Sequence, residues 1–180
     1  MSSIGNLKEL SGDMEDTCGC SPQANLTASP VAAVCPTNQK PGQVVAALTL
    51  RALLARTLMG VRPVEYRFCR EPDCPTVYYS ADGQQVFAEA DLREKVYQKH
   101  TDDDEAPVCY CFRHTVGSIR AEITETGRST VVERIRAGIQ AGACACDIRN
   151  PQGGCCLGNV RQLVALCERQ NRHARPAPGT

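Results

Sequence analysis

The sequence predicts an α+β protein in which a small antiparallel sheet is followed by several short helices. Three observations support this fold class. Short apolar segments with a strand-like pattern lie between residues 35 and 100, separated by turns that contain proline or glycine. After residue 107, apolar residues instead recur with the spacing of amphipathic helices. The chain also has 12 cysteines, only 4% aromatic residues and no tryptophan, so groups other than apolar side chains must help to stabilise it.

The first half of the chain contains the predicted sheet. Residues 1–34 are rich in Ser, Ala, Pro, Asp and Glu without periodicity, which predicts a disordered arm. Residues 35–100 are expected to form a β module. Its predicted strands are residues 44–50, 64–68, 76–79 and 85–87.

The second half is expected to be helical. Residues 101–107 form an acidic run that predicts a solvated linker and a domain boundary. Residues 108–170 are expected to form one helical domain, and residues 171–180 a disordered tail.

Capping residues place three helices in this domain. Thr115 can cap a helix that stops at Gly127, and Thr130 with Glu133 predicts a capping box for a second helix that ends near Gly142. A third helix is expected after Gly158-Asn159, with an apolar stripe made of Val160, Leu163, Val164 and Cys167. On this stripe, Cys167 is interpreted as a core residue.

Charge and hydropathy exclude several classes of partner. The chain carries 20 basic and 20 acidic side chains, so no overall charge favours nucleic acid or an anionic membrane. The first 16 residues are polar and acidic, unlike a secretory signal, and no apolar run is long enough to span a membrane. We therefore expect a soluble, cytoplasmic protein. In that reducing compartment, 12 thiols are expected to be metal ligands or redox groups rather than structural disulfides.

Six cysteines of the helical half occur as three close pairs: Cys109 and Cys111, Cys144 and Cys146, and Cys155 and Cys156. A helical hairpin between the first two pairs can bring them to one centre, and four thiolates suit either tetrahedral zinc or an iron–sulfur cluster. Residues 107–180 hold 10 basic and 5 acidic side chains, and cysteines precede two predicted helix starts. Both features favour an anionic cluster, although cysteines can also be small buried apolar residues.

The sheet half contains a second group of thiols. Cys69 and Cys74 flank a proline-containing turn between two predicted strands, and Cys35 supplies a third sulfur, which together suggest a zinc site. Such a site would stabilise a sheet with few large side chains. Closed structural zinc needs four ligands, and position 38 is Asn rather than a second thiol. The fourth ligand is left open among Cys18, Cys20, Asp73, His100 and water, and Cys69 and Cys74 could instead simply line a turn.

Two motifs resemble the N-terminal half of CopZ-type copper chaperones over about residues 35 to 170. They are the Cys-Tyr-Cys-Phe sequence at 109–112 and the Asn-Pro-Gln-Gly-Gly-Cys-Cys sequence at 150–156. That family joins a mononuclear zinc module to a [2Fe-2S] domain similar to bacterioferritin-associated ferredoxin. The resemblance implies a zinc-stapled antiparallel β module followed by such a short-helix domain. Matched positions imply that Cys35, Cys69 and Cys74 bind zinc and that the cluster ligands are Cys109, Cys111, Cys146 and Cys156.

The sequence departs from this family in two respects. Cys144 and Cys155 adjoin the implied ligands and compete with Cys146 and Cys156 for the third and fourth positions. Full-length chaperones of the family also carry a heavy-metal-associated domain with a Met-x-Cys-x-x-Cys loop, which is absent from these 180 residues. We therefore expect the N-terminal type of region without that domain. If the protein handles copper, the surplus soft thiols are Cys18, Cys20, Cys144 and Cys155.

These observations predict a metal-binding protein rather than an enzyme. Metal reduction is the one activity that they allow. No Ser-His-Asp order, phosphate-binding glycine loop or dinucleotide fingerprint is present. The predicted function is a [2Fe-2S] and zinc electron-transfer module linked to copper or another soft metal ion, through Cu(II) reduction or delivery with an unidentified redox partner protein. The alternative is a non-redox interaction or metal-storage protein with zinc in both sites.

Overall fold

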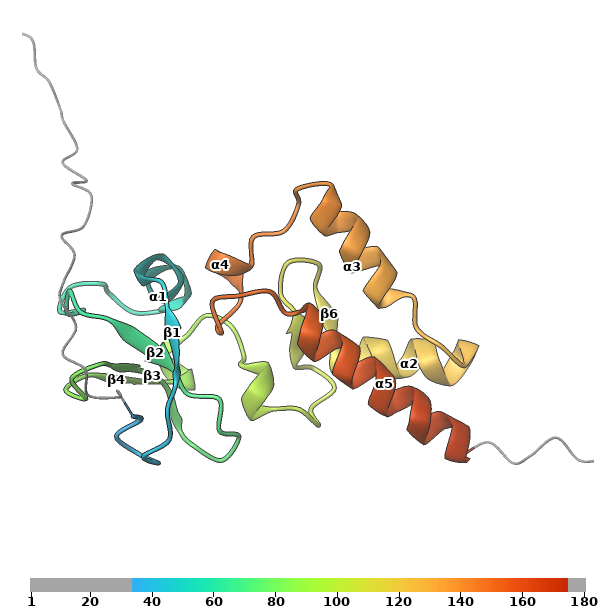
Figure 1. Cartoon of the computed structure of the whole chain (residues 1–180), viewed down its shortest axis with the longest axis horizontal. Coiled ribbons are helices and arrows are strands. Elements are labelled where there is room, and N and C mark those ends of the chain that lie inside the picture. The colour runs from blue at the N-terminus through green and yellow to red at the C-terminus, as the bar shows by residue number, and fades with distance from the viewer. Residues whose placement is uncertain (1–33, 175–180) are drawn as a thin grey trace, which may run out of the picture.

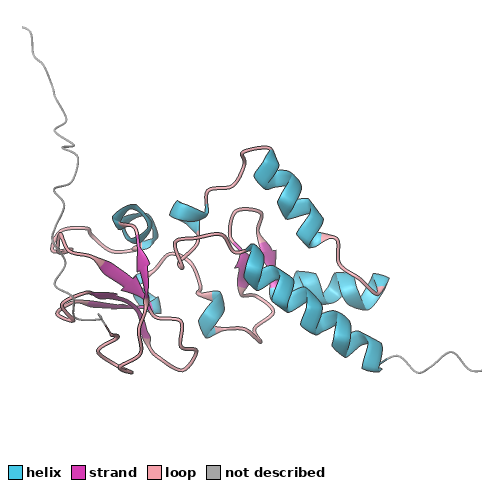
Figure 2. Cartoon of the chain, viewed as in Figure 1, coloured by secondary structure: helices cyan, strands magenta, loops and turns pink. Residues whose placement is uncertain are grey.

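The computed structural model describes residues 34–174, in which a sheet-containing half and a helical half lie side by side (Figure 1). The predicted α+β class is confirmed. One sheet has four antiparallel strands in the order β1-β2-β3-β4, and a second has two strands, β5 and β6 (Figure 2). The strands of the larger sheet are β1 (Gln43–Val45), β2 (Tyr66–Phe68), β3 (Thr76–Ser80) and β4 (Val86–Ala88).

The sheet is built around β3. Every residue of this strand is buried, and Tyr79 lies between Arg67 on β2 and Val86 on β4. The aromatic rings of Phe68 and Tyr78 pack with centroids 6.0 Å apart. The strands expected at 64–68, 76–79 and 85–87 are confirmed, although the first and last pair over only three residues each.

Of the strand expected at residues 44–50, only residues 44 and 45 form a strand. Strand β1 ends at Val45, and helix α1 (Ala47–Leu53) follows immediately. Leu50 and Leu53 are three residues apart and both buried, which is the helical spacing, and alanine and leucine are strong helix formers. A short apolar run of this kind does not distinguish strand from helix until its packing partners are known.

The acidic segment 101–107 is less open than expected. Asp103 forms an ion pair with Lys95 at 2.6 Å, and Asp104 forms one with Arg120 of the helical half at 2.7 Å. Ala106 is fully buried. The segment therefore ties the two halves together. Two short 3-10 helices precede it, Glu89–Asp91 and Tyr97–Lys99.

The helical half begins with a β-hairpin that periodicity did not reveal, because its strands are too short. Strand β5 (Pro107–Cys109) pairs with β6 (His114–Thr115). The helices that follow are α2 (Val116–Thr126), α3 (Val131–Gln140), α4 (Cys146–Arg149) and α5 (Leu157–Ala174).

The predicted caps of α2 are confirmed, whereas the capping box of α3 is wrong. Thr115 accepts a hydrogen bond from the Ser118 amide at 3.1 Å, and Gly127 ends α2 in the left-handed conformation at φ +83°. Thr130 precedes α3, but its hydroxyl makes no cap. It donates instead to the carboxylate of Glu122 on α2 at 2.8 Å, so a tertiary partner displaces the local one.

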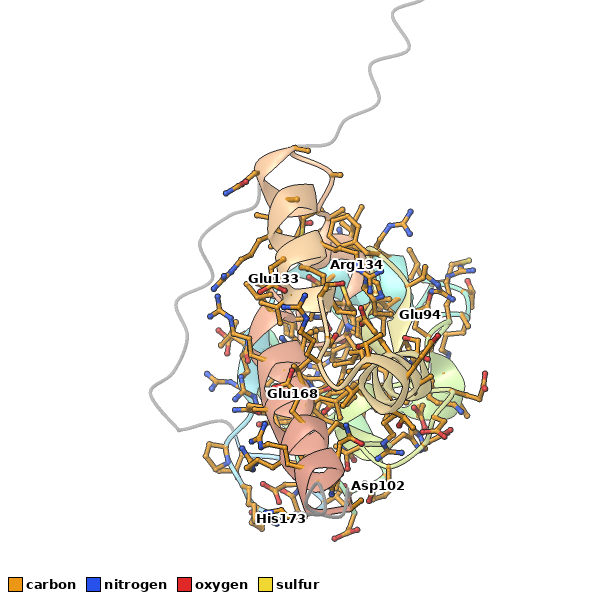
Figure 3. All side chains as sticks on the ribbon, turned by 90° about the vertical axis from the view of Figure 1, so that its right-hand side faces the viewer. Glu94, Asp102, Glu133, Arg134, Glu168 and His173 are labelled. Carbon is orange, nitrogen blue, oxygen red and sulfur yellow. The ribbon has the colours of Figure 1, made fainter. Side chains whose placement is uncertain are left out.

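Helix α5 crosses the helical half and supplies much of its core (Figure 1). It extends four residues beyond the boundary expected at 170. Figure 3 shows polar and charged side chains on its outer surface and labels Glu168 and His173. No helix between residues 34 and 174 is long and apolar enough to cross a membrane. The predicted apolar stripe is confirmed, since these residues are all buried: Val160, Leu163, Val164 and Cys167.

Candidate metal centres

The first centre is formed by three cysteines of the sheet half. The sulfur atoms of Cys35, Cys69 and Cys74 all lie within 4.8 Å of one another, and those of Cys35 and Cys74 are 3.8 Å apart. All three side chains are buried. The three residues expected to bind zinc are therefore brought together, although the sequence separates Cys35 from the other two by more than 30 positions.

Two tight turns bring these three thiols together. Cys35 opens a turn closed by the Gln39 amide, which donates to the Cys35 carbonyl at 2.8 Å, with Gln39 at φ +61°. Cys69 directly follows β2, and Cys74 closes the next turn by donating its amide to the Glu71 carbonyl at 3.2 Å. The strands thus fix both ends of the Cys69–Cys74 turn, because β2 and β3 pair beside it.

Asn38 is part of this centre although it is not a thiol. Its side-chain amide donates to the Cys69 sulfur at 3.2 Å, while its oxygen accepts the Lys40 amide at 2.9 Å. Burial raises the pKa of Cys69. Burial also opposes ionisation of Cys35, but the backbone amides of Asn38 and Thr37 and the neighbouring thiols outweigh it and lower the pKa of Cys35.

No fourth side chain completes the centre among the described residues. Within residues 34–174, no other cysteine, histidine or carboxylate belongs to the three-thiol group. His100, one expected candidate, has its Nε2 2.6 Å from a Glu89 oxygen, and Asp73 and His100 line a pocket of about 250 Å³ with Cys74. Cys18 and Cys20 lie outside the described residues. The identity of the fourth ligand stays a prediction.

The second centre collects five thiols from the helical half. Cys144 and Cys146 have their sulfur atoms 3.3 Å apart, and the Cys111 sulfur lies 3.6 Å from Cys146 and 3.9 Å from Cys144. The Cys156 thiol contacts those of both Cys109 and Cys146. The four cysteines implied as cluster ligands are thus linked by sulfur contacts, with Cys144 as a fifth member.

Cys155 does not belong to this group. Its side chain is exposed, whereas that of the adjacent Cys156 is only 1% exposed. Consecutive residues at the start of a helix point in different directions, so only one of the two faces the core. Sequence spacing alone left open which of Cys155 and Cys156 joins the thiol group.

Contacts between these thiols shift their pKa values in opposite directions. The Cys156 thiol lowers the pKa of Cys146 to about 5 and that of Cys109 to about 7. The same contacts raise the pKa of Cys156, with Cys109 as the largest cause. Burial raises the pKa of Cys111 to about 12. The Ala145 amide donates to the Cys111 sulfur at 3.3 Å and partly offsets this rise. At neutral pH Cys146 is therefore a thiolate, the form that binds metal.

The elements of the helical half hold these thiols in place. Cys109 ends β5, Cys111 lies in the following hairpin turn, Cys146 begins α4 and Cys156 directly precedes α5. Phe112, next to Cys111, packs against α3 at Gly138, where an added Cβ would clash with the ring. Gly138 thus leaves room for the ring next to Cys111, and the sequence could not identify this role because it depends on a tertiary contact.

The loop before Cys156 is docked on the sheet half. The Tyr78 hydroxyl donates to the Pro151 carbonyl at 2.6 Å, and the Gln43 side chain donates to the Gln152 carbonyl at 3.1 Å. Within the loop, the Gln152 side chain donates to the Cys155 carbonyl at 3.0 Å. The position of this cysteine pair therefore depends on strands β1 and β3. Sequence reasoning missed these contacts, because they join residues more than 70 positions apart.

Helix α1 makes a further contact with this region. The buried Thr49 hydroxyl donates to the Asp147 carbonyl of α4 at 2.5 Å. Gly153 has φ +70°, and a Cβ added to it would lie 3.3 Å from the Val45 side chain. The glycine thus permits both the turn and its close approach to the sheet half.

Comparisons with known proteins agree with this geometry. Residues 32–93, which include the three thiols of the first centre, match a family model of the CopZ type described as a zinc binding domain. The copper chaperone CopZ of Archaeoglobus fulgidus is 30% identical over 129 residues, which cover 72% of this chain. The match spans 60% of that protein's length.

A solved structure has the same fold. The X-ray structure of the A. fulgidus CopZ N-terminal domain aligns with a TM-score of 0.61 and 29% identity, covering 72% of this chain and 96% of that one. The resemblance seen in the Cys-Tyr-Cys and Asn-Pro-Gln-Gly-Gly-Cys-Cys motifs is thus supported by independent comparisons of sequence and of fold. The matched part of the chain is therefore similar to the CopZ N-terminal region, and residues 32–93 match the model of a zinc binding domain.

Proposed function

We propose that this protein is a [2Fe-2S] and zinc electron-transfer module that serves copper handling by reducing Cu(II) to Cu(I). One observation carries the proposal. Thiols from three separate segments of the helical half converge beside a CopZ-type zinc binding domain. The proposed zinc module covers residues 35–100, and the proposed cluster domain covers residues 108–170, joined by residues 101–107.

The donor set fits a two-iron cluster better than a single zinc ion. Zinc–thiolate bonds of about 2.3 Å place the four sulfurs of a tetrahedral site about 3.8 Å from one another. Here the group of sulfurs within 4.8 Å of one another contains Cys111, Cys144 and Cys146 but neither Cys109 nor Cys156. The buried Cys109 and Cys156 lie outside that group, and their thiols interact with each other. Two iron atoms, each held by two thiolates, require such a paired arrangement.

The surrounding charges also favour an anionic group. Residues 107–180 carry 10 basic and 5 acidic side chains. Cys156 directly precedes the 18-residue helix α5, whose first backbone amides lack partners within the helix. The Ala145 amide donates to the Cys111 sulfur. Such N–H groups stabilise negative charge on sulfur.

The three thiols of the sheet half are proposed to hold zinc in a structural role. Their burial and their match to the zinc binding domain support this assignment. A metal ion that joins the Cys35 turn to the Cys69–Cys74 turn would stabilise one end of the central strand pair in a sheet whose strands are mostly three residues long. It would take no part in electron transfer, because zinc has no redox chemistry.

The residues of the chain position the redox centre and shield it from water. When bound, a [2Fe-2S] cluster supplies one electron, which reduces one Cu(II) to Cu(I) after an electron-donor protein has reduced the cluster. Cys109 and Cys156 would hold the buried side of the cluster, since these residues are 0% and 1% exposed. Cys111 and Cys144 are half-buried, so the opposite side is the one that an approaching copper ion can reach.

Elemental analysis tests the cofactor assignment. Protein purified without oxygen is expected to be reddish-brown, with about two irons and two acid-labile sulfides per chain. It is also expected to contain about one zinc. Cys109→Ser and Cys156→Ser should lose the colour and the sulfide, whereas the exposed Cys155→Ser should retain both. Colourless protein with zinc in both sites and no sulfide would contradict the proposal.

Copper titration tests the activity. Cu(II) added to the anaerobic, reduced protein is expected to reoxidise the cluster with one electron per copper. A Cu(I)-specific chromogenic chelator should then report an equal amount of Cu(I). If the cluster absorbance stays that of the reduced form, the copper-reducing role is wrong even where the cluster itself is confirmed.

A further inference from the structure

The helical half contains one more clustered thiol than a [2Fe-2S] cluster requires. Cys144 lies 3.3 Å from Cys146 and 3.9 Å from Cys111, measured between sulfur atoms, and the third side of this triangle is 3.6 Å. All three sulfurs lie within 4.8 Å of one another. One small ion can therefore contact all three with little movement of the side chains. We call these three residues the trithiol group.

The trithiol group lies on the accessible side of the centre. Cys111 and Cys144 are half-buried, and the residues before Cys144, 141–143, are exposed. The remaining two thiols, Cys109 and Cys156, are buried. An ion from solvent would thus meet the trithiol group first.

The donor set indicates which kind of ion this group selects. It contains only sulfur, and between residues 34 and 174 no histidine or carboxylate belongs to it. Hard ions prefer oxygen ligands, and structural zinc prefers four ligands. Thiolates select Cu(I), which is soft and does not require a fourth ligand. The trithiol group is therefore better matched to Cu(I) than to zinc.

We propose that Cys111, Cys144 and Cys146 bind one Cu(I) ion when the cluster is absent, and that Cu(I) therefore competes with the cluster for Cys111 and Cys146. Three sulfur–copper bonds form, and the protons of those groups that were thiols pass to solvent. Neither copper nor sulfur changes its oxidation state. The competition rests on the proposed cluster, whereas Cu(I) binding by the trithiol group does not.

Affinity measurements on cluster-free protein test the binding site. Zinc is kept bound, so that Cys35, Cys69 and Cys74 are occupied, and Cys18 and Cys20 are replaced by serine in every sample. Cu(I) is supplied in complex with bathocuproine disulfonate without oxygen. The parent protein is expected to withdraw one Cu(I), and Cys144→Ser should weaken this binding at least about tenfold.

Cys155→Ser is the matched control, because Cys155 is close in sequence but exposed and outside the trithiol group. Its affinity for Cu(I) should equal that of the parent. Circular dichroism confirms that each variant is folded. Equal affinity of Cys144→Ser and the parent would overturn the proposed site, as would an equal loss in Cys155→Ser.

A second measurement tests the competition. Cu(I) added to cluster-loaded protein should bleach the cluster several-fold faster in the parent than in Cys144→Ser. Equal bleaching rates would overturn the competition. Absence of acid-labile sulfide in the starting protein would instead contradict the proposed function and leave the result of the affinity measurement standing. The two failures are thus distinguishable.

Discussion

Asn38 occupies the position where a second thiol would complete the first centre. Its amide nitrogen lies 3.2 Å from the Cys69 sulfur, so a side chain at this position reaches the three-thiol group. We predict that Asn38→Cys supplies a fourth thiolate and raises the affinity for zinc at least about tenfold, or about 1.4 kcal/mol. Competition with a chromogenic zinc chelator measures the change.

Asn38→Ser is the control for this substitution. It removes the amide but adds no soft ligand, so its affinity for zinc should not exceed that of the parent. An unchanged affinity in Asn38→Cys would show that another group already fills the fourth position.

Cys146 differs from an ordinary cysteine in its ionisation. The Cys156 thiol holds the pKa of Cys146 at about 5, against an ordinary value of 9.0. Because the pKa is lowered, the thiolate is present above about pH 5 and becomes protonated as the pH falls through that value. In metal-free protein, the ultraviolet thiolate absorbance should therefore show a step near pH 5.

The assignment of this step is checked by substitution. Cys146→Ser should lose it, and the exposed Cys155→Ser should retain it. A step that persists in Cys146→Ser would assign it to another thiol of the group.

At the scale of elements, strand β3 connects the two centres. It begins two residues after Cys74 and carries Tyr78, whose buried hydroxyl donates to the Pro151 carbonyl. Pro151 belongs to the loop that leads to Cys156. The strand therefore links the turn of the first centre to the loop of the second.

Removal of this hydroxyl should weaken the link. Tyr78→Phe leaves a buried carbonyl without its donor, so we expect a loss of about 1–3 kcal/mol in the free energy of unfolding. Cluster-loaded protein should also lose its absorbance faster. Denaturant unfolding and the decay of the visible spectrum measure the two effects.

Tyr66→Phe serves as the comparison for Tyr78→Phe. Tyr66 is also buried in the sheet, but its hydroxyl bonds to Gln85 within the sheet half rather than to the cysteine loop. It should destabilise the fold without accelerating loss of the cluster. Equal acceleration by both substitutions would mean that general stability, rather than this contact, controls retention of the cluster.

At the scale of the whole molecule, the two halves behave as one structure. Helix α1 packs against α4 (Figure 1), and Gln43, Thr49 and Tyr78 all hydrogen-bond to the segment between Cys146 and Cys156. We predict that removal of zinc loosens this surface, lowers the melting temperature and shortens the lifetime of the cluster. Calorimetry and visible absorbance before and after chelation of zinc measure these changes.

Cys69→Ser provides the control for zinc removal. This variant lacks one thiol of the first centre, so a chelator should have no further effect on its cluster. A cluster whose lifetime is unchanged by zinc removal in the parent would contradict coupling between the halves.

Local sequence determined several features of this protein. The caps of α2 and the stripe of α5 depend on residues three or four positions apart, so pattern alone identifies them. The pairs of cysteines around tight turns likewise indicated thiol centres before any fold was known. Residue types and short spacings were sufficient because these features involve neighbours along the chain.

Tertiary structure decided the rest. It replaced the capping box of α3 with a contact between Thr130 and Glu122, and it converted part of the segment 44–50 into helix α1. It also placed Cys144 inside the thiol group and Cys155 outside it. Each outcome depends on contacts between distant segments, and the free energy of such contacts exceeds the small local preferences that a sequence pattern reports.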